Sequence, residues 1–155
     1  MPTGAGITAW LVLRAVDPNN YYAAQLGVAT SGVTTLTWYK RVAGSLTMLG
    51  AGVTVAAHTA GTTRRITAAV FGSSLMAKAW IPSTALEPGW QVMATDTSLT
   101  TGTQVGVLTR LETGNSNTLP VVVAVDNVAV TNPQSMTLSA RGVSGRSGRG
   151  RQAPT

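Results

Sequence analysis

The 155-residue chain contains no cysteine, one histidine and few aromatic residues. Without cysteine the chain has no disulfide, no thiolate metal site and no cysteine nucleophile. No apolar run reaches the roughly 20 residues that a membrane-spanning helix needs, so we expect no membrane partner. The first residues, MPTGAGIT, lack the basic start and apolar stretch of a secretory signal peptide, and we expect none.

Charge is also scarce, at 10% of residues, and the formal net charge of +6 is unevenly distributed. Four of the eleven basic residues lie in a C-terminal stretch that contains no acid, at Arg141, Arg146, Arg149 and Arg151. Removing these four leaves seven basic residues against five acids, so the rest of the chain is nearly neutral. We therefore expect one domain over residues 1–140, a flexible Gly/Ser/Arg-rich tail over residues 141–155, and no nucleic-acid partner.

Alternation of apolar and polar residues recurs along the chain, whereas sustained helical periodicity does not. The expected strands cover residues 6–16, 21–29, 33–42, 46–49, a short piece ending at 55, and then 64–71, 75–80, 90–94, 104–111 and 120–130. Short strands at this spacing, separated by turn-forming residues, predict an antiparallel β-sandwich or barrel. Residues 121–130 (VVVAVDNVAV) are apolar on both faces and predict a central strand packed on both sides.

The residues that catalysis requires are sparse, and we expect no enzyme. The one histidine, His58, lies in an Ala/Thr/Gly stretch without a nearby carboxylate in sequence. Glycoside hydrolysis needs two carboxylates facing each other, and no two acids of this chain are two or four residues apart. The five acids are Asp17, Glu87, Asp96, Glu112 and Asp126.

A calcium site is the one cofactor that the sequence suggests. Asp17, Asn19 and Asn20 supply a partial set of the oxygen ligands that calcium prefers. The same sequence, Asp-Pro-Asn-Asn, is more typical of a turn whose side chains bind their own backbone. We expect no metal at any other position.

Glycan binding on a sheet face uses aromatic side chains together with polar groups. Trp38 and Lys40 alternate on one expected strand and Lys78 and Trp80 on another, while Arg14 shares a face with Trp10. The candidate glycan-binding residues are Arg14, Tyr22, Gln25, Trp38, Lys40, Lys78, Trp80 and Asp126. The alternative interpretation, which we favour for the tryptophans, places Trp38 and Trp80 in the core with the lysines at its margin.

Three groups of segments resemble a known family. They are 20–24 (NYYAA) with 40–44 (KRVAG), then 71–80 (FGSSLMAKAW) with 87–90 (EPGW), and finally 94–97 (ATDT) with 105–107, 115–123 (NSNTLPVVV) and 126–130. In order and spacing they resemble the concanavalin A-like (laminin-G-like) jelly-roll domains of minor tail proteins from phages that infect actinobacteria. The resemblance implies an antiparallel jelly-roll β-sandwich that lacks the family's first strands, before Gly6. Another copy or a neighbouring protein would then cover the unpaired edge by strand addition.

The resemblance also implies a role. We expect a non-enzymatic structural and adhesive protein of a phage or phage-like particle, found in the virion and outside the cell after host lysis. Its jelly roll would face outward and bind host-surface glycans, with other virion proteins and further copies of itself as partners. One alternative is a capsid or tail decoration protein that makes protein contacts alone, and another is a glycan-cleaving enzyme.

Overall fold

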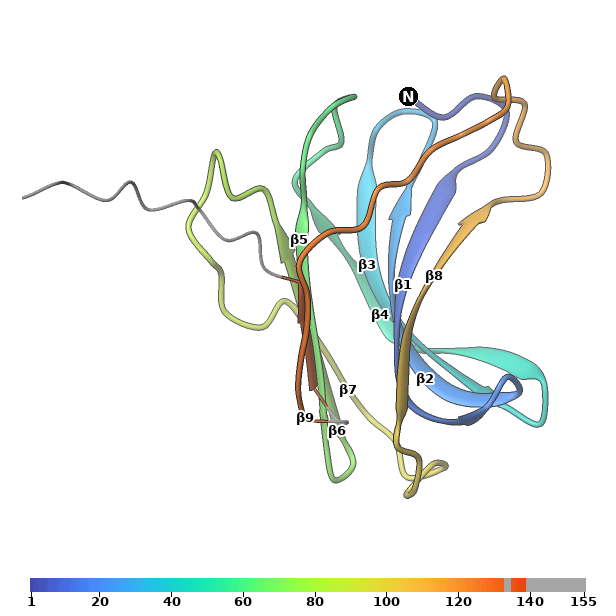
Figure 1. The fold of residues 1–155 in the computed structure, drawn as a ribbon, viewed down its shortest axis with the longest axis vertical. Helices are drawn as coiled ribbons and strands as arrows, with labels where there is room; N and C mark the ends of the chain where they lie inside the picture. The colour runs from blue at the N-terminus through green and yellow to red at the C-terminus, as the bar shows by residue number, and fades with distance from the viewer. Residues whose placement is uncertain (133–134, 139–155) are drawn as a thin grey trace, which may run out of the picture.

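The computed structural model describes residues 1–132 and 135–138, and within them it shows ten β-strands and no helix (Figure 1). The expected tail over residues 141–155 lies outside the described residues. No helix that could cross a bilayer occurs in the described part of the chain. The strands are β1 Ile7–Asp17, β2 Asn20–Val28, β3 Thr34–Val42, β4 Ser45–Val55, β5 Arg65–Phe71, β6 Ser74–Trp80, β7 Val92–Thr95, β8 Gln104–Leu111, β9 Val128–Asn132 and β10 Ser135–Leu138.

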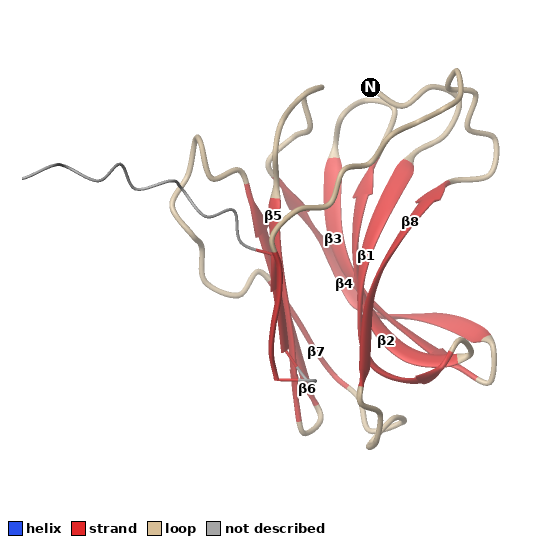
Figure 2. Cartoon of the chain, viewed as in Figure 1, coloured by secondary structure: helices blue, strands red, loops and turns tan. Residues whose placement is uncertain are grey.

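The strands form two five-stranded antiparallel sheets, which face each other as two layers (Figure 2). Sheet A has the strand order β4-β3-β2-β1-β8, and sheet B has the order β7-β6-β5-β10-β9. Most neighbouring strands are consecutive in the sequence and form hairpins. The pairs β1–β8 and β5–β10 instead bring together distant parts of the sequence. The predicted all-β antiparallel sandwich is therefore confirmed.

The tight turns lie where the sequence offers residues that tolerate positive φ. Ala43 and Gly44 join β3 to β4 with φ values of 49° and 83°. Two consecutive residues with positive φ give a turn whose twist matches that of the two strands. Gly72, with φ of 57°, follows β5 at the turn into β6. Both turns lie between strands that the sequence predicts.

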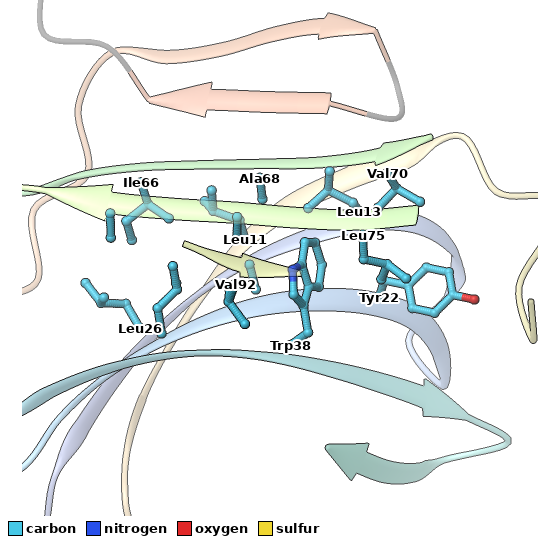
Figure 3. Close-up of a cluster of buried hydrophobic side chains, with 14 of the residues drawn as sticks. Leu11, Leu13, Tyr22, Leu26, Trp38, Ile66, Ala68, Val70, Leu75 and Val92 are labelled. Carbon is cyan, nitrogen blue, oxygen red and sulfur yellow. The ribbon is translucent and has the colours of Figure 1, made fainter. Parts of the chain in front are cut away.

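The main core lies between the two sheets (Figure 3). Leu11, Leu13 and Trp38 point from sheet A toward Val70 and Leu75 of sheet B. The Trp38 side chain is 0% exposed, so the core interpretation of this residue is correct. Burial of each such side chain stabilises the fold by roughly 1.5–3 kcal/mol.

One predicted face is wrong, because β1 does not alternate regularly to its end. The register of β1 against both β2 and β8 shifts after Leu13 and Val12, and Arg14 has a positive φ of 48°. This bulge places the guanidinium of Arg14, which is buried, within hydrogen-bond distance of the carbonyl oxygens of Gly72 (2.7 Å) and Leu99 (3.1 Å). Arg14 therefore points toward sheet B and does not share a face with Trp10.

The predicted central strand over residues 120–130 is also wrong. β9 begins only at Val128, at the edge of sheet B, and residues 121–127 form no strand. The reason is topological, since β8 ends in sheet A and the chain must cross to sheet B before β9 (Figure 1). A segment that passes from one layer to the other cannot lie in the middle of either sheet.

The first strand of the chain is not itself an edge strand. β1 lies between β2 and β8 and has a partner on each side. The edges of the two sheets are instead β4 and β8 in sheet A, and β7 and β9 in sheet B.

Candidate functional site

The face of sheet A that points away from sheet B carries two rows of facing residues that run across the strands. In the first row Arg110, Thr8, Gly27 and Thr35 lie side by side on β8, β1, β2 and β3. In the second row Leu108, Trp10, Gln25 and Thr37 do the same. Because side chains alternate along a strand, these rows lie on the opposite face from the core residues Leu11 and Leu36.

A surface groove of about 430 Å³ follows these rows, and we name it the outer groove. Its lining includes Thr8, Trp10, Gln25, Gly27, Thr35, Tyr39, Leu46, Arg110 and Glu112. These residues come from all five strands of sheet A or lie directly beside them. The lining thus combines aromatic rings, hydroxyls, an amide and an ion pair.

Two aromatic rings form one wall of the outer groove. The ring centroids of Trp10 and Tyr39 are 5.1 Å apart, and their planes are inclined at 49°. Trp10 packs with Ala15, Tyr21 and Ala23 in a small second apolar cluster, which fixes the indole in place. Aromatic pairs in such tilted arrangements are favourable, and the buried indole holds the half-buried Tyr39 ring in place at the groove.

A hydrogen-bonded chain of polar groups forms another wall. The Trp10 indole donates to Thr8 Oγ1 at 2.8 Å, and Thr8 Oγ1 donates to Glu112 Oε1 at 3.2 Å. The other oxygen of Glu112 accepts from Arg110 at 2.6 Å, and this hydrogen bond raises the pKa of Arg110. Both carboxylate oxygens of Glu112 are thereby engaged by neighbouring side chains.

The floor of the outer groove depends on a glycine and an unpaired amide. A Cβ atom at Gly27 would lie 3.7 Å from Thr8 Cγ2 and 3.8 Å from Gln25 Oε1, so the missing side chain leaves a depression between these residues. The half-buried Gln25 amide has no hydrogen-bond partner within the described residues. Gln25 is therefore the group with spare capacity to bind a ligand in this groove.

Four of the sequence-predicted residues lie elsewhere in sheet A and point toward the core or the sandwich end. Trp38 and Tyr22 are fully buried, and Arg14 binds backbone carbonyls as described above. The Tyr22 hydroxyl donates to Asp96 Oδ1 at 2.8 Å, and Lys40 Nζ binds Asp96 Oδ2 at 2.6 Å. These residues are thus structural and are not presented together to a ligand.

The Asp96 network ties the chain between β7 and β8 to sheet A. Lys40 also donates to Ser98 Oγ at 2.7 Å, and the Ser98 backbone donates to Asp96 at 2.8 Å. Burial alone raises the pKa of Asp96, but the hydrogen bonds from Lys40, Ser98 and Tyr22 outweigh it and hold the pKa well below its usual range. Asp96 is therefore a carboxylate whose charge stabilises the fold.

Lys78 and Trp80 do lie together, on the outer face of sheet B. Lys78 Nζ is 6.0 Å from the Trp80 ring centroid and 4.7 Å from that of Trp90, and it binds Glu87 Oε1 at 2.6 Å. The guanidinium of Arg65 lies over the Trp80 ring at 5.4 Å. Trp80 is 5% exposed, as expected for a packed residue, and the lysine is held by cation–π contacts that fix the 81–91 loop.

The last two sets of predicted residues are bonded to their near neighbours in sequence. Asp126 lies in the segment before β9 and accepts hydrogen bonds from the neighbouring Asn127. Asp17 accepts from the Asn20 side chain and from the Asn19 backbone at 2.7 Å, bonds that lower its pKa. The three calcium candidates thus form the self-bonded turn typical of their sequence, and no cluster of three acidic or histidine residues occurs in the described ranges.

Sequence reasoning found one residue of the outer groove, Gln25, and missed Thr8, Tyr39, Arg110 and Glu112. Because side chains alternate along a strand, Trp10 lies on the opposite face of β1 from Leu11, and Tyr39 lies on the opposite face of β3 from Trp38. This alternation is visible in the sequence. No local signal shows that β8 lies beside β1, and this pairing supplies Arg110 and Glu112.

Comparison of the chain with protein-family models, curated proteins and solved structures finds no match. The resemblance to phage tail domains therefore rests on the sequence segments quoted above.

Proposed function

We propose that this protein is a non-enzymatic adhesion domain of a phage or phage-like particle, and that its outer groove binds a glycan of the host surface. The placement in a virion, the release by host lysis and the jelly-roll relationship come from the sequence resemblance. The outer groove is the observation that carries the binding function. It is the place where an aromatic wall and hydrogen-bonding groups converge on an exposed sheet face.

The chemistry of the outer groove suits a sugar better than an apolar ligand. Its volume of about 430 Å³ lies within the range of small-ligand sites. Tyr39, the half-buried member of the aromatic pair, offers ring surface to the C–H face of a pyranose, while Gln25 offers both a donor and an acceptor to hydroxyl groups. The Arg110–Glu112 pair leaves the groove with little net charge, which favours a neutral glycan over a strongly anionic one.

The same lining supports binding without cleavage. Glu112 is the one carboxylate among the groove residues, and it is already bonded to Thr8 and Arg110. Hydrolysis of a glycosidic bond normally needs a second carboxylate on the opposite side of the sugar.

A decoration protein that makes protein contacts alone is the second candidate. Exposed large apolar residues gather along β8 and the chain that follows it, and such gatherings mark protein interfaces. They are Val107, Leu108, Leu111, Leu119, Val122, Val123, Val125, Val128 and Val130. This surface and the outer groove share no lining residue, so the two functions are separable by mutation.

A glycan array with two valine variants tests the glycan proposal. Gly27→Val puts a side chain into the groove floor, where the nearest atoms to its Cβ are 3.7 Å away or more, so the fold tolerates it. Gly106→Val is the matched control, because Gly106 faces Val12 in the same sheet, has open space around it and does not line the groove. We expect the wild type and Gly106→Val to bind the same glycans and Gly27→Val to lose at least tenfold in affinity.

Three results would count against the proposal. The first is a wild type that binds no glycan from host cell walls on the array. The second is equal binding by Gly27→Val. The third is loss of binding in Trp90→Ala, which would move the site to the outer face of sheet B.

A further inference from the structure

β8 leaves one whole side of its backbone without a partner in the described chain. It pairs with β1 on one side and forms the edge of sheet A on the other. Edge strands of stable monomers are usually short, bulged, covered or charged. β8 is eight residues long and carries a single charged side chain, that of Arg110. It is therefore a template for another strand.

The segment that follows contains a strand-like run that pairs with nothing in the described chain. Residues 121–125 read VVVAV, a composition typical of strands. From Thr118 to Asp126 the backbone makes no hydrogen bond to another described backbone group. Val122 is 81% exposed, so this apolar run lies open to solvent.

β8 and the 121–125 run themselves carry one charged side chain, that of Arg110, and the other charged groups near them, Arg64, Arg65 and Asp126, line the cleft between them. No charged residue occurs between Glu112 and Asp126. β8 and the 121–125 run also border the same cleft, about 670 Å³ in volume, which Val107 lines from one side and Val121–Val125 from the other. A surface that holds both an open strand edge and an unpaired strand-like run is complementary to a second copy of itself.

We propose that two copies of this chain associate through this surface, with residues 121–125 of each copy adding as a strand to β8 of the other. A two-fold axis makes the exchange reciprocal, so one interface satisfies both edges and the assembly closes as a dimer. The 121–125 run fits within the length of β8, because five extended residues span about 17 Å and β8 spans about 27 Å. Pairing of the uncharged 121–125 run with β8, whose one charged side chain is Arg110, brings no like charges together, which favours a second copy over a charged partner.

The absence of cysteine from the chain makes disulfide trapping a clean test. Val107→Cys and Val123→Cys proteins, each with one cysteine, are mixed and oxidised. Because a disulfide between positions 107 and 123 then has to join different molecules, we expect a crosslinked dimer to accumulate at least tenfold faster than in a control mixture. The control replaces Val123→Cys by Leu86→Cys, a position that is 94% exposed in the loop that projects from the outer side of sheet B (Figure 1).

Sedimentation of the full chain provides the second readout. We expect a concentration-dependent monomer–dimer equilibrium that Val122→Lys weakens at least tenfold and that Leu86→Lys leaves unchanged. Both sites are exposed, so neither lysine disturbs the fold, which circular dichroism verifies. A monomer at about 100 µM, equal crosslinking in the two mixtures, or an unchanged equilibrium in Val122→Lys would overturn the proposal.

Discussion

Replacement of Asp96 by asparagine is expected to destabilise the fold through loss of one charge. The asparagine side chain keeps the shape of the aspartate and one acceptor oxygen, but it cannot form an ion pair with Lys40. The wild-type carboxylate accepts from the Lys40 ammonium at 2.6 Å, from the Tyr22 hydroxyl at 2.8 Å and from the Ser98 backbone at 2.8 Å. The substitution removes the first of these bonds and weakens the other two.

The magnitude follows from the partial burial of this pair. Hydrogen bonds to charged groups contribute roughly 1.5–3 kcal/mol each when buried, and fully exposed ion pairs contribute about 0–1 kcal/mol. The side chains of Lys40 and Asp96 are 23% and 11% exposed, which places the pair between these limits. We expect a loss of about 2 kcal/mol, or a fall of about 1 M in the urea midpoint for a domain of this size.

The pH dependence separates a charge effect from a packing effect. The folded-state pKa of Asp96 lies below its unfolded value, so its charge stabilises the fold above the unfolded pKa, and that contribution is lost as the pH falls below about 4. Urea unfolding, followed by tryptophan fluorescence, should therefore show a constant gap between wild type and Asp96→Asn from pH 5 to 7. The gap should shrink as the pH is lowered toward 2.5.

Glu112→Gln is the matched control, because Glu112 also binds its partner, Arg110, at 2.6 Å but at the surface, where the side chains are 31% and 53% exposed. It should cost less than about 0.5 kcal/mol. An equal loss in the two variants, or an Asp96→Asn gap that stays constant down to pH 2.5, would refute the reasoning.

Two further predictions concern packing. Trp38→Ala empties the centre of the core and should destabilise the fold by about 4 kcal/mol in urea unfolding, whereas a loss below about 1 kcal/mol would show that Trp38 is not a core residue. A Cβ at Gly52 would overlap Thr37 Oγ1 and lie 2.8 Å from Thr35 Cγ2, so Gly52→Ala should lower the melting temperature and cost about 1–3 kcal/mol. Gly106→Ala meets nothing within 4 Å and should change stability by less than about 1 kcal/mol; equal losses at the two glycines would contradict this account.

Alternation and turn residues were sufficient to predict most strands, because strands such as β3 and β6 have one buried face and one more exposed face. The expected strand at residues 104–111 coincides with β8, and the ends of β2, β3 and β5 differ from those expected by at most one residue. Two features escaped prediction for physical reasons. The bulge at Arg14 requires a positive φ, which nothing in an arginine side chain predicts. The strand-like composition of residues 121–125 does not reveal that the chain passes from one sheet to the other there.

The candidate site was less predictable than the fold, since it depends on which strands are neighbours. Gln25 could be identified from its polar side chain in an apolar strand. The contribution of Arg110 required the β1–β8 pairing, between strands separated by most of the chain. The aromatic residues chosen first, Trp38 and Trp80, are buried because large aromatic rings stabilise cores as effectively as they bind sugars.

Backbone amide chemical-shift mapping with a glycan selected on the array tests the central claim most directly. The account predicts that shifts concentrate at Thr8, Gln25 and Gly27 and at their neighbours across β1, β2 and β3. Shifts that concentrate around Lys78, Trp80 and Trp90 instead, or that are absent at saturating glycan, would contradict it.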